Sequence, residues 1–201
     1  MVAPAKVWTV EQVLALPWDG RRIELIDGVL LVNGVEVPNG DLEHLDPAMT
    51  PSASLLHQRV LLELALELRS WLHRTRAGVA VIAPADVRIV PGTVVQPDVF
   101  VTPLVGGRAP RELVEIESLL LAVEILSPST ARADRGRKRA LYQRAGVPEY
   151  WIVDSEFRRV ERWTEGAQNG EIVTATLEWL PPGAPEPFRI DLASFFARVL
   201  D

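Results

Sequence analysis

VEILSPST, residues 123–130, is the stretch of sequence that decides the fold of this chain. Its branched apolar residues predict a strand buried on both faces, which Pro128 ends. Glu124 nevertheless stands within that strand. A buried carboxylate costs several kcal/mol unless a partner compensates its charge. What compensates Glu124 is therefore the central question of the sequence.

The composition limits the possible classes of protein. With 201 residues, 48% of them hydrophobic, the chain is expected to form a single domain over residues 1–201. The absence of cysteine excludes disulfides, thiolate zinc sites and cysteine nucleophiles. A net charge of −6 argues against a generally basic protein that coats nucleic acid. No signal-peptide pattern and no apolar run of about 18 residues occurs, so we expect a cytoplasmic protein without a membrane segment.

The first half of the chain predicts a hairpin and one long helix. Thr9 and Gln12 form a capping box, which predicts a short helix from Val10 to Pro17. RIELIDGVLLV, residues 22–32, contains an Asp-Gly turn signal between two β-rich runs and predicts an N-terminal β-hairpin. We expect a long loop over residues 33–51 and a helix over residues 52–76.

The second half predicts strands interrupted by helices. We expect strands near residues 79–83, 86–90, 94–101, 119–126, 149–154, 158–164 and 171–179. A helix is predicted over residues 131–145, with Gly146 at its C-terminal cap, and Asp191 caps a last helix. The fold class is therefore α/β, a mixed β-sheet flanked by helices.

Two acids interrupt neighbouring apolar strands, and they are the first candidates for chemistry. They are Asp98, directly after Pro97, and Glu124. Like charges that converge from adjacent strands need a cation between them, and Mg²⁺ or Mn²⁺ prefers such oxygen ligands. A buried arginine that pairs with each acid is the alternative, and the pattern leaves both open.

Lysine usage adds a third candidate. Of 21 basic residues only Lys6 and Lys138 are lysine, and Lys138 lies among arginines. An ammonium handles protons and contacts phosphate closely in ways that a guanidinium does not. Asp134 and Tyr142 lie four residues to either side of Lys138, so the three share one stripe of a regular helix. The neighbouring arginines 132, 135, 137, 139 and 144 are equally typical of a solvated helix face.

These motifs occur together in a known family. The ordered set PDVFV, VEILSPST, D-x-x-x-K-x-x-x-Y and GVPEYWIVD, with RIELIDG upstream, resembles the Uma-two family of bacterial restriction-endonuclease-like proteins. That family is a branch of the PD-(D/E)xK nuclease superfamily. The resemblance runs from about Val10 to Asp154, and it implies a restriction-endonuclease-like fold.

The resemblance also implies roles for individual residues. Asp98, Glu124 and the main-chain carbonyl of Ile125 would hold a divalent metal, Mg²⁺ or Mn²⁺. The usual lysine two positions after the second acid is replaced here by Leu126, so Lys138 would take its role. Supporting residues would be Glu24, His57, Asp134 and Tyr142. For His57, a hydrogen bond to a loop at the start of the helix is an equally good explanation.

Two function classes remain. The first is a metal-dependent endonuclease that hydrolyses DNA, acting as a homodimer because cutting both strands needs two sites. The second is a catalytically silent relative that binds nucleic acid or regulates. Retention of Asp98, Glu124 and Lys138 favours the first class, whereas net acidity and the missing second-position lysine favour the other.

Overall fold

A six-stranded sheet forms the centre of the protein. We describe it from a computed structural model, in which residues 7–17, 19–42 and 54–200 are described. The strand order is β4-β5-β6-β7-β8-β9, and only β6 and β7 run parallel. These strands are β4 (Val79–Ile82), β5 (Val99–Thr102), β6 (Leu121–Ile125), β7 (Glu149–Asp154), β8 (Arg159–Thr164) and β9 (Glu171–Val173).

Two small antiparallel sheets accompany the central one. The predicted hairpin is present as β1 (Ile23–Ile26) and β2 (Val29–Val32), joined at Asp27 and Gly28, whose φ angles of 54° and 73° suit a type I′ turn. A third strand, β3 (Val35–Glu36), extends this sheet. The other small sheet pairs β10 (Thr176–Trp179) with β11 (Phe188–Asp191).

The helices match the predicted patterns in most places. Thr9 and Gln12 form the predicted capping box of α1 (Val10–Leu14). The long helix α2 (Leu55–Thr75) is capped by the Ser54 side chain. Asp191 caps α5 (Leu192–Leu200), since its carboxylate accepts from the Ser194 amide at 2.8 Å. No helix in the described ranges is long and apolar enough to cross a lipid bilayer.

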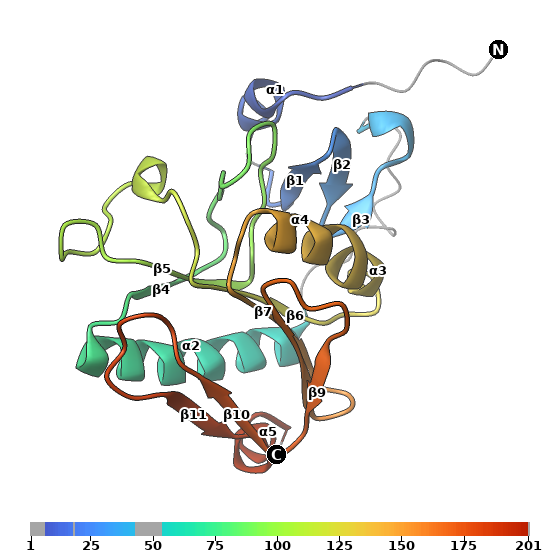
Figure 1. The fold of residues 1–201 in the computed structure, drawn as a ribbon. Coiled ribbons are helices and arrows are strands. Elements are labelled where there is room, and N and C mark those ends of the chain that lie inside the picture. The colour runs from blue at the N-terminus through green and yellow to red at the C-terminus, as the bar shows by residue number, and fades with distance from the viewer. Residues whose placement is uncertain (1–6, 18, 43–53, 201) are drawn as a thin grey trace.

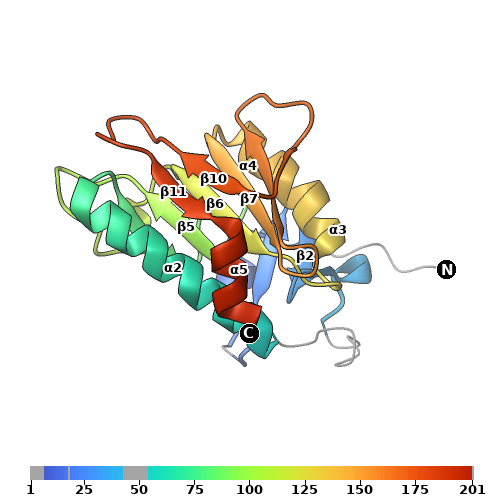
Figure 2. The same ribbon diagram turned by 90° about the horizontal axis from the view of Figure 1, so that it is seen from below.

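The central sheet is covered on both faces (Figures 1 and 2). On one face lie α2, α5 and the β10–β11 sheet, packed on odd-numbered residues of β5, β6 and β7, such as Val123 and Trp151. On the other face lie the hairpin and the helix that follows β6, packed on even-numbered residues such as Phe100 and Ile152. Because successive side chains on a strand alternate, this second face is also the one to which Asp98 and Glu124 belong.

The helix after β6 differs from the prediction of one regular helix. It consists of α3 (Ala131–Ala133), a π-helical turn η4 (Asp134–Lys138) and α4 (Arg139–Arg144). A π-turn widens the helix by one residue and often occurs at functional sites. The predicted C-terminal glycine is present, since Gly146 has φ of 68°.

Four other predictions were wrong in detail. The strand predicted over residues 94–101 begins only at Val99, because Val94 and Val95 form isolated bridges to Leu25 and Val87. Residues 86–90 form no regular strand, because prolines 84, 91 and 97 lack N–H donors and only a Val87–Val95 bridge remains. Residues 171–179 split into β9 and β10, since a bend lies at residues 174–175. The predicted loop 33–51 contains β3 and the 3₁₀ turn η1 (Pro38–Gly40), while residues 43–51 lie outside the described ranges. A second 3₁₀ turn, η3 (Leu113–Glu115), precedes β6.

Candidate active site

The two predicted acids face one another across β5 and β6. These strands are antiparallel with Val99 opposite Val123, so the same register sets Asp98 opposite Glu124. Opposite residues of an antiparallel pair point to the same face of a sheet. The Ile125 amide also donates to Asp98 Oδ2 at 2.7 Å, which ties the start of β5 to the end of β6. Asp98 and Glu124 are 3% and 1% exposed.

The hairpin brings a third acid to the same place. Glu24 lies on β1, is fully buried, and accepts from the Gln96 amide at 2.9 Å through Oε1. A backbone bond from Leu25 to the Val94 carbonyl, at 2.8 Å, holds β1 against the segment that leads to Asp98. The hairpin therefore brings Glu24 next to Asp98 and Glu124.

Lys138 points into this acidic cluster from η4. Its ammonium donates to Glu124 Oε1 at 2.9 Å and lies 3.1 Å from Glu24 Oε1, and the side chain is fully buried. The Tyr142 hydroxyl donates to the same Glu124 oxygen at 3.1 Å. Lys138 and Tyr142 thus share one stripe, as predicted, although η4 is π-helical.

Asp134 begins the same turn and is more weakly attached. Its Oδ1 lies 3.8 Å from Lys138 Nζ, beyond hydrogen-bond distance, and the side chain is 1% exposed. Neither of its carboxylate oxygens has a hydrogen-bond partner among the described residues. Asp134 therefore adds negative charge to the cluster without being fixed by it.

Arg22 is the residue that the sequence interpretation did not anticipate. Its NH1 donates to Asp98 Oδ1 at 2.6 Å, its NH2 to Glu124 Oε2 at 3.1 Å, and its Nε to Glu24 Oε2 at 3.3 Å. One guanidinium thus bridges all three acids, which is the buried-arginine alternative that the strand pattern left open. RIELIDG offered a signal, because Arg22 and Glu24 are two residues apart on one strand and so share a face.

Burial and the neighbouring charges shift the pKa values of the acids in the cluster and of Lys138. Burial raises the pKa of Glu124 to about 8 even though Lys138 and Arg22 oppose the shift, and burial also raises that of Asp134 to about 6. Burial alone would raise the pKa of Asp98, but the hydrogen bond from His57 and the charge of Arg22 hold it below its ordinary value. Burial and Arg22 oppose the charge on Lys138, but Glu124 and Glu24 outweigh them and raise its pKa. The acids thus outnumber their basic partners.

His57, on the first turn of α2, reaches the cluster from the other side. Its Nε2 lies 3.1 Å from Asp98 Oδ2, so the ring donates to that carboxylate. His57 also lines a cleft of about 830 Å³ whose wall includes Ser127, Pro128, Arg135 and Phe157. His57 is therefore shared between the cleft wall and the cluster, whose four acids do not themselves line the cleft.

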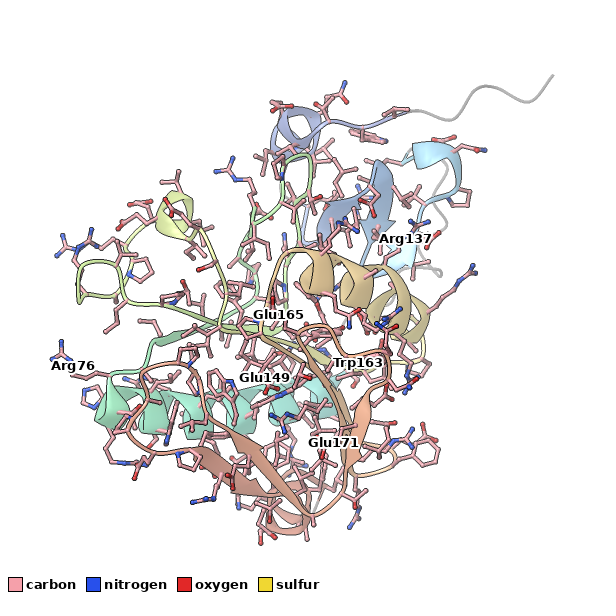
Figure 3. All side chains as sticks on the ribbon, in the orientation of Figure 1. Arg76, Arg137, Glu149, Trp163, Glu165 and Glu171 are labelled. Carbon is pink, nitrogen blue, oxygen red and sulfur yellow. The ribbon has the colours of Figure 1, made fainter. Side chains whose placement is uncertain are left out.

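The remaining candidates have other surroundings. His73 is exposed, and His44 lies outside the described residues. Of the arginines on the helix after β6, Arg135 pairs with Glu161, and Arg144 pairs with Asp27 at 2.5 Å. Arg137, labelled in Figure 3, donates to Glu36 Oε1 on β3 at 2.7 Å. These arginines fasten the helix to its neighbours rather than forming a free basic face.

No ready-made metal site is present among residues 7–17, 19–42 and 54–200, in the sense of three or more Asp, Glu or His side chains arranged to hold an ion. Arg22 lies among the acids that would form such a group. The donor set itself suits a hard divalent cation, because it consists of carboxylate oxygens. The four acids Glu24, Asp98, Glu124 and Asp134 exceed Arg22 and Lys138 by two charges when ionised, so the residues fit an ion if Arg22 gives way.

Comparison with known proteins places this chain in a family. Residues 33–193 match the Uma-two family model, described as "Putative restriction endonuclease". The chain belongs to the Uma-two family. No curated protein matches it.

A solved structure supports the assignment of the fold. It is the crystal structure of a "putative nuclease belonging to DUF820" from Anabaena variabilis, with a TM-score of 0.72 and 18% sequence identity. The match covers 96% of this Uma-two chain and 99% of the Anabaena chain. At this identity the likeness concerns the fold, a mixed sheet with flanking helices.

Proposed function

We propose that this protein is a metal-dependent nuclease with a restriction-endonuclease-like fold, which hydrolyses phosphodiester bonds in DNA. One observation carries the proposal: Asp98, Glu124 and Lys138, from three separate segments, meet in a single buried cluster. Burying so many charges is costly, and clusters with perturbed pKa values gather at functional sites. Membership of the Uma-two family supports the same reaction class.

The resemblance to the family implies the metal ligands, and the contacts of Lys138 and Tyr142 support the roles of those two residues. Asp98, Glu124 and the Ile125 carbonyl would hold Mg²⁺ or Mn²⁺, with Glu24 beside them. When bound, such an ion lowers the pKa of a water molecule and neutralises charge on the phosphate. Lys138 keeps its ammonium charged between Glu24 and Glu124 and would stabilise negative charge on the phosphate. Tyr142 holds the Glu124 oxygen that Lys138 also contacts.

His57 and the cleft give this cluster a way to reach a substrate. His57 is the cleft residue that touches Asp98, so a strand lying in the cleft would pass next to the acids. Cutting both strands of a duplex at one position needs two such sites, which a homodimer would supply.

A catalytically silent relative is the second candidate, and Arg22 is the observation that favours it. Each oxygen of the Glu24, Asp98 and Glu124 carboxylates already has a donor or an ammonium within 3.3 Å. A cluster satisfied in this way is stable without an ion. In that case the fold would serve nucleic-acid binding or regulation.

A cleavage assay separates the two candidates. Plasmid, single-stranded DNA and RNA are incubated with Mg²⁺ or Mn²⁺ and the wild-type protein, or with Asp98→Asn, Glu124→Gln or Lys138→Met. We expect metal-dependent cleavage of DNA that each substitution lowers at least about 100-fold. Glu149→Gln is the matched control, because Glu149, labelled in Figure 3, is a buried acid on β7 that pairs with Arg162 and not with a residue of the cluster.

Three outcomes have distinct meanings. Cleavage that the control retains and the three variants lose supports the proposal. Cleavage that persists in all three variants overturns the assigned residues. No cleavage of any substrate by the folded wild-type protein favours the silent relative.

A further inference from the structure

Arg22 occupies the point at which the three acids converge. It precedes β1 directly, and its side chain lies on the same face as that of Glu24. Its three nitrogens reach three carboxylates that belong to β1, to the start of β5 and to β6. The oxygens that it contacts are Glu24 Oε2, Asp98 Oδ1 and Glu124 Oε2.

Lys138 uses different oxygens of the same acids. It contacts Glu24 Oε1 and Glu124 Oε1, which lie on the far side of both carboxylates from Arg22. Each of these two acids is therefore held between an ammonium on one oxygen and a guanidinium on the other. Removing Arg22 would free one oxygen on each of three acids, while Lys138 would still hold the cluster together.

Arg22 also lies on the solvent side of the cluster. Its side chain is 19% exposed and that of His57 is 13% exposed, whereas those of Glu24, Asp98, Glu124 and Lys138 are at most 4% exposed. An ion that arrives from solvent therefore meets Arg22 and His57 before it meets a carboxylate. A guanidinium and a divalent ion that contact the same three carboxylates would lie at contact distance from each other, where their charges repel, so binding of one disfavours binding of the other.

From this geometry we propose that the Arg22 guanidinium occupies the place of the divalent ion when no ion is bound. It then competes directly with that ion for Glu24, Asp98 and Glu124. Binding of the ion requires the guanidinium to leave these oxygens. Arg22 thereby raises the concentration of divalent ion that is needed to occupy the site. The inference deepens the proposed function and rests on it for the choice of ion.

Binding of Mn²⁺ to the protein without DNA tests this competition. Free Mn²⁺ is measured by electron paramagnetic resonance in titrations of wild type, Arg22→Gln and Arg137→Gln. Arg137 is the control, because it is an arginine paired with one acid, Glu36, outside the cluster. We expect Arg22→Gln to bind Mn²⁺ at least about ten-fold more tightly than wild type, and Arg137→Gln to bind as wild type does.

A second variant keeps the test decisive if Arg22→Gln does not fold. Arg22→Lys retains the charge, but an ammonium lacks the planar fork that contacts three carboxylates at once. Its affinity for Mn²⁺ should lie above that of wild type. Thermal unfolding in Mn²⁺, with K⁺ at equal ionic strength as the reference, should show a larger rise in Tm for both Arg22 variants than for Arg137→Gln.

The results separate this inference from the proposed function. Affinity for Mn²⁺ that is equal or lower in the folded Arg22 variants overturns the competition, even if the wild-type protein cleaves DNA. Tighter binding in those variants upholds the competition, even if the wild-type protein cleaves nothing and the nuclease assignment fails.

Discussion

Lys138 donates to Glu124 at 2.9 Å with its ammonium fully buried. The two residues are 14 positions apart, and the contact fastens η4 to the end of β6. The charge of Glu124 in its buried strand is therefore compensated by the Lys138 ammonium on one oxygen and by the Arg22 guanidinium on the other.

Breaking this pair should be costly, and removing both charges should cost less. Lys138→Met leaves Glu24 and Glu124 without their ammonium and is expected to lower the free energy of unfolding by about 3–5 kcal/mol. Combining Lys138→Met with Glu124→Gln should restore part of the lost free energy of unfolding, because an amide needs no countercharge. Urea unfolding of the two single variants and the double variant measures this, and strictly additive effects would contradict a direct interaction.

The raised pKa values of Glu124 and Asp134 predict that stability falls as pH rises. In the unfolded chain these carboxyls lose their protons near pH 4, whereas the folded protein keeps them up to about pH 8 and about pH 6 respectively. Folding therefore takes up protons between about pH 4 and 8, and the free energy of unfolding should decrease across that window. Urea unfolding at stepped pH checks the slope.

Single substitutions show which carboxyl group causes the decrease in the free energy of unfolding with rising pH. Glu124→Gln should remove its share of the decrease throughout about pH 4 to 8, which is the whole of it above about pH 6, and Asp134→Asn should remove its share between about pH 4 and 6 only. Asp98 acts in the opposite sense, because its lowered pKa gives stability that is lost only under strongly acidic conditions. A wild-type stability that does not fall between pH 5 and 8 would contradict the raised pKa values of Glu124 and Asp134.

His57 is expected to position Asp98 through its Nε2. His57→Gln places an amide N–H near the same point, whereas His57→Ala removes the donor from Asp98 Oδ2. Cleavage by the alanine variant should fall about ten-fold or more and that by the glutamine variant should fall less. Equal loss in the two variants would indicate that the imidazole acts on the substrate itself.

The Tyr142 hydroxyl should contribute to stability more than to chemistry. Tyr142→Phe removes one hydrogen bond to Glu124, which keeps Lys138, so the expected cost is about 1 kcal/mol with less than about a ten-fold change in cleavage. Tyr150→Phe is a matched control, because its buried hydroxyl donates to the Asp134 carbonyl at 3.0 Å. Loss of cleavage in Tyr142→Phe as complete as in Glu124→Gln would assign the hydroxyl a direct role.

Local patterns predicted most of the elements that carry the site. The capping box of α1, the Asp-Gly hairpin, the apolar stripe of α2 and the β6 strand depend on neighbouring residues, and all are present. The π-turn at Asp134–Lys138 and the pairing of β10 with β11 were not predicted. The π-turn places Lys138 against Glu24, which is distant in the sequence, and the connection between β10 and β11 over residues 180–187 is too long for a two-residue hairpin signal.

What the sequence alone determined is that Asp98 and Glu124 interrupt apolar strands and that Lys138 is one of two lysines in a chain rich in arginine. These are properties of local pattern and composition. Only the tertiary structure decided that Arg22 lies among the acids, 76 residues from Asp98 and 102 from Glu124 along the chain. The physical reason is that a charged side chain pairs with any opposite charge that the fold brings within about 4 Å. The sequence does not distinguish an arginine that will pair with distant acids from one that will face solvent, until the strands are placed.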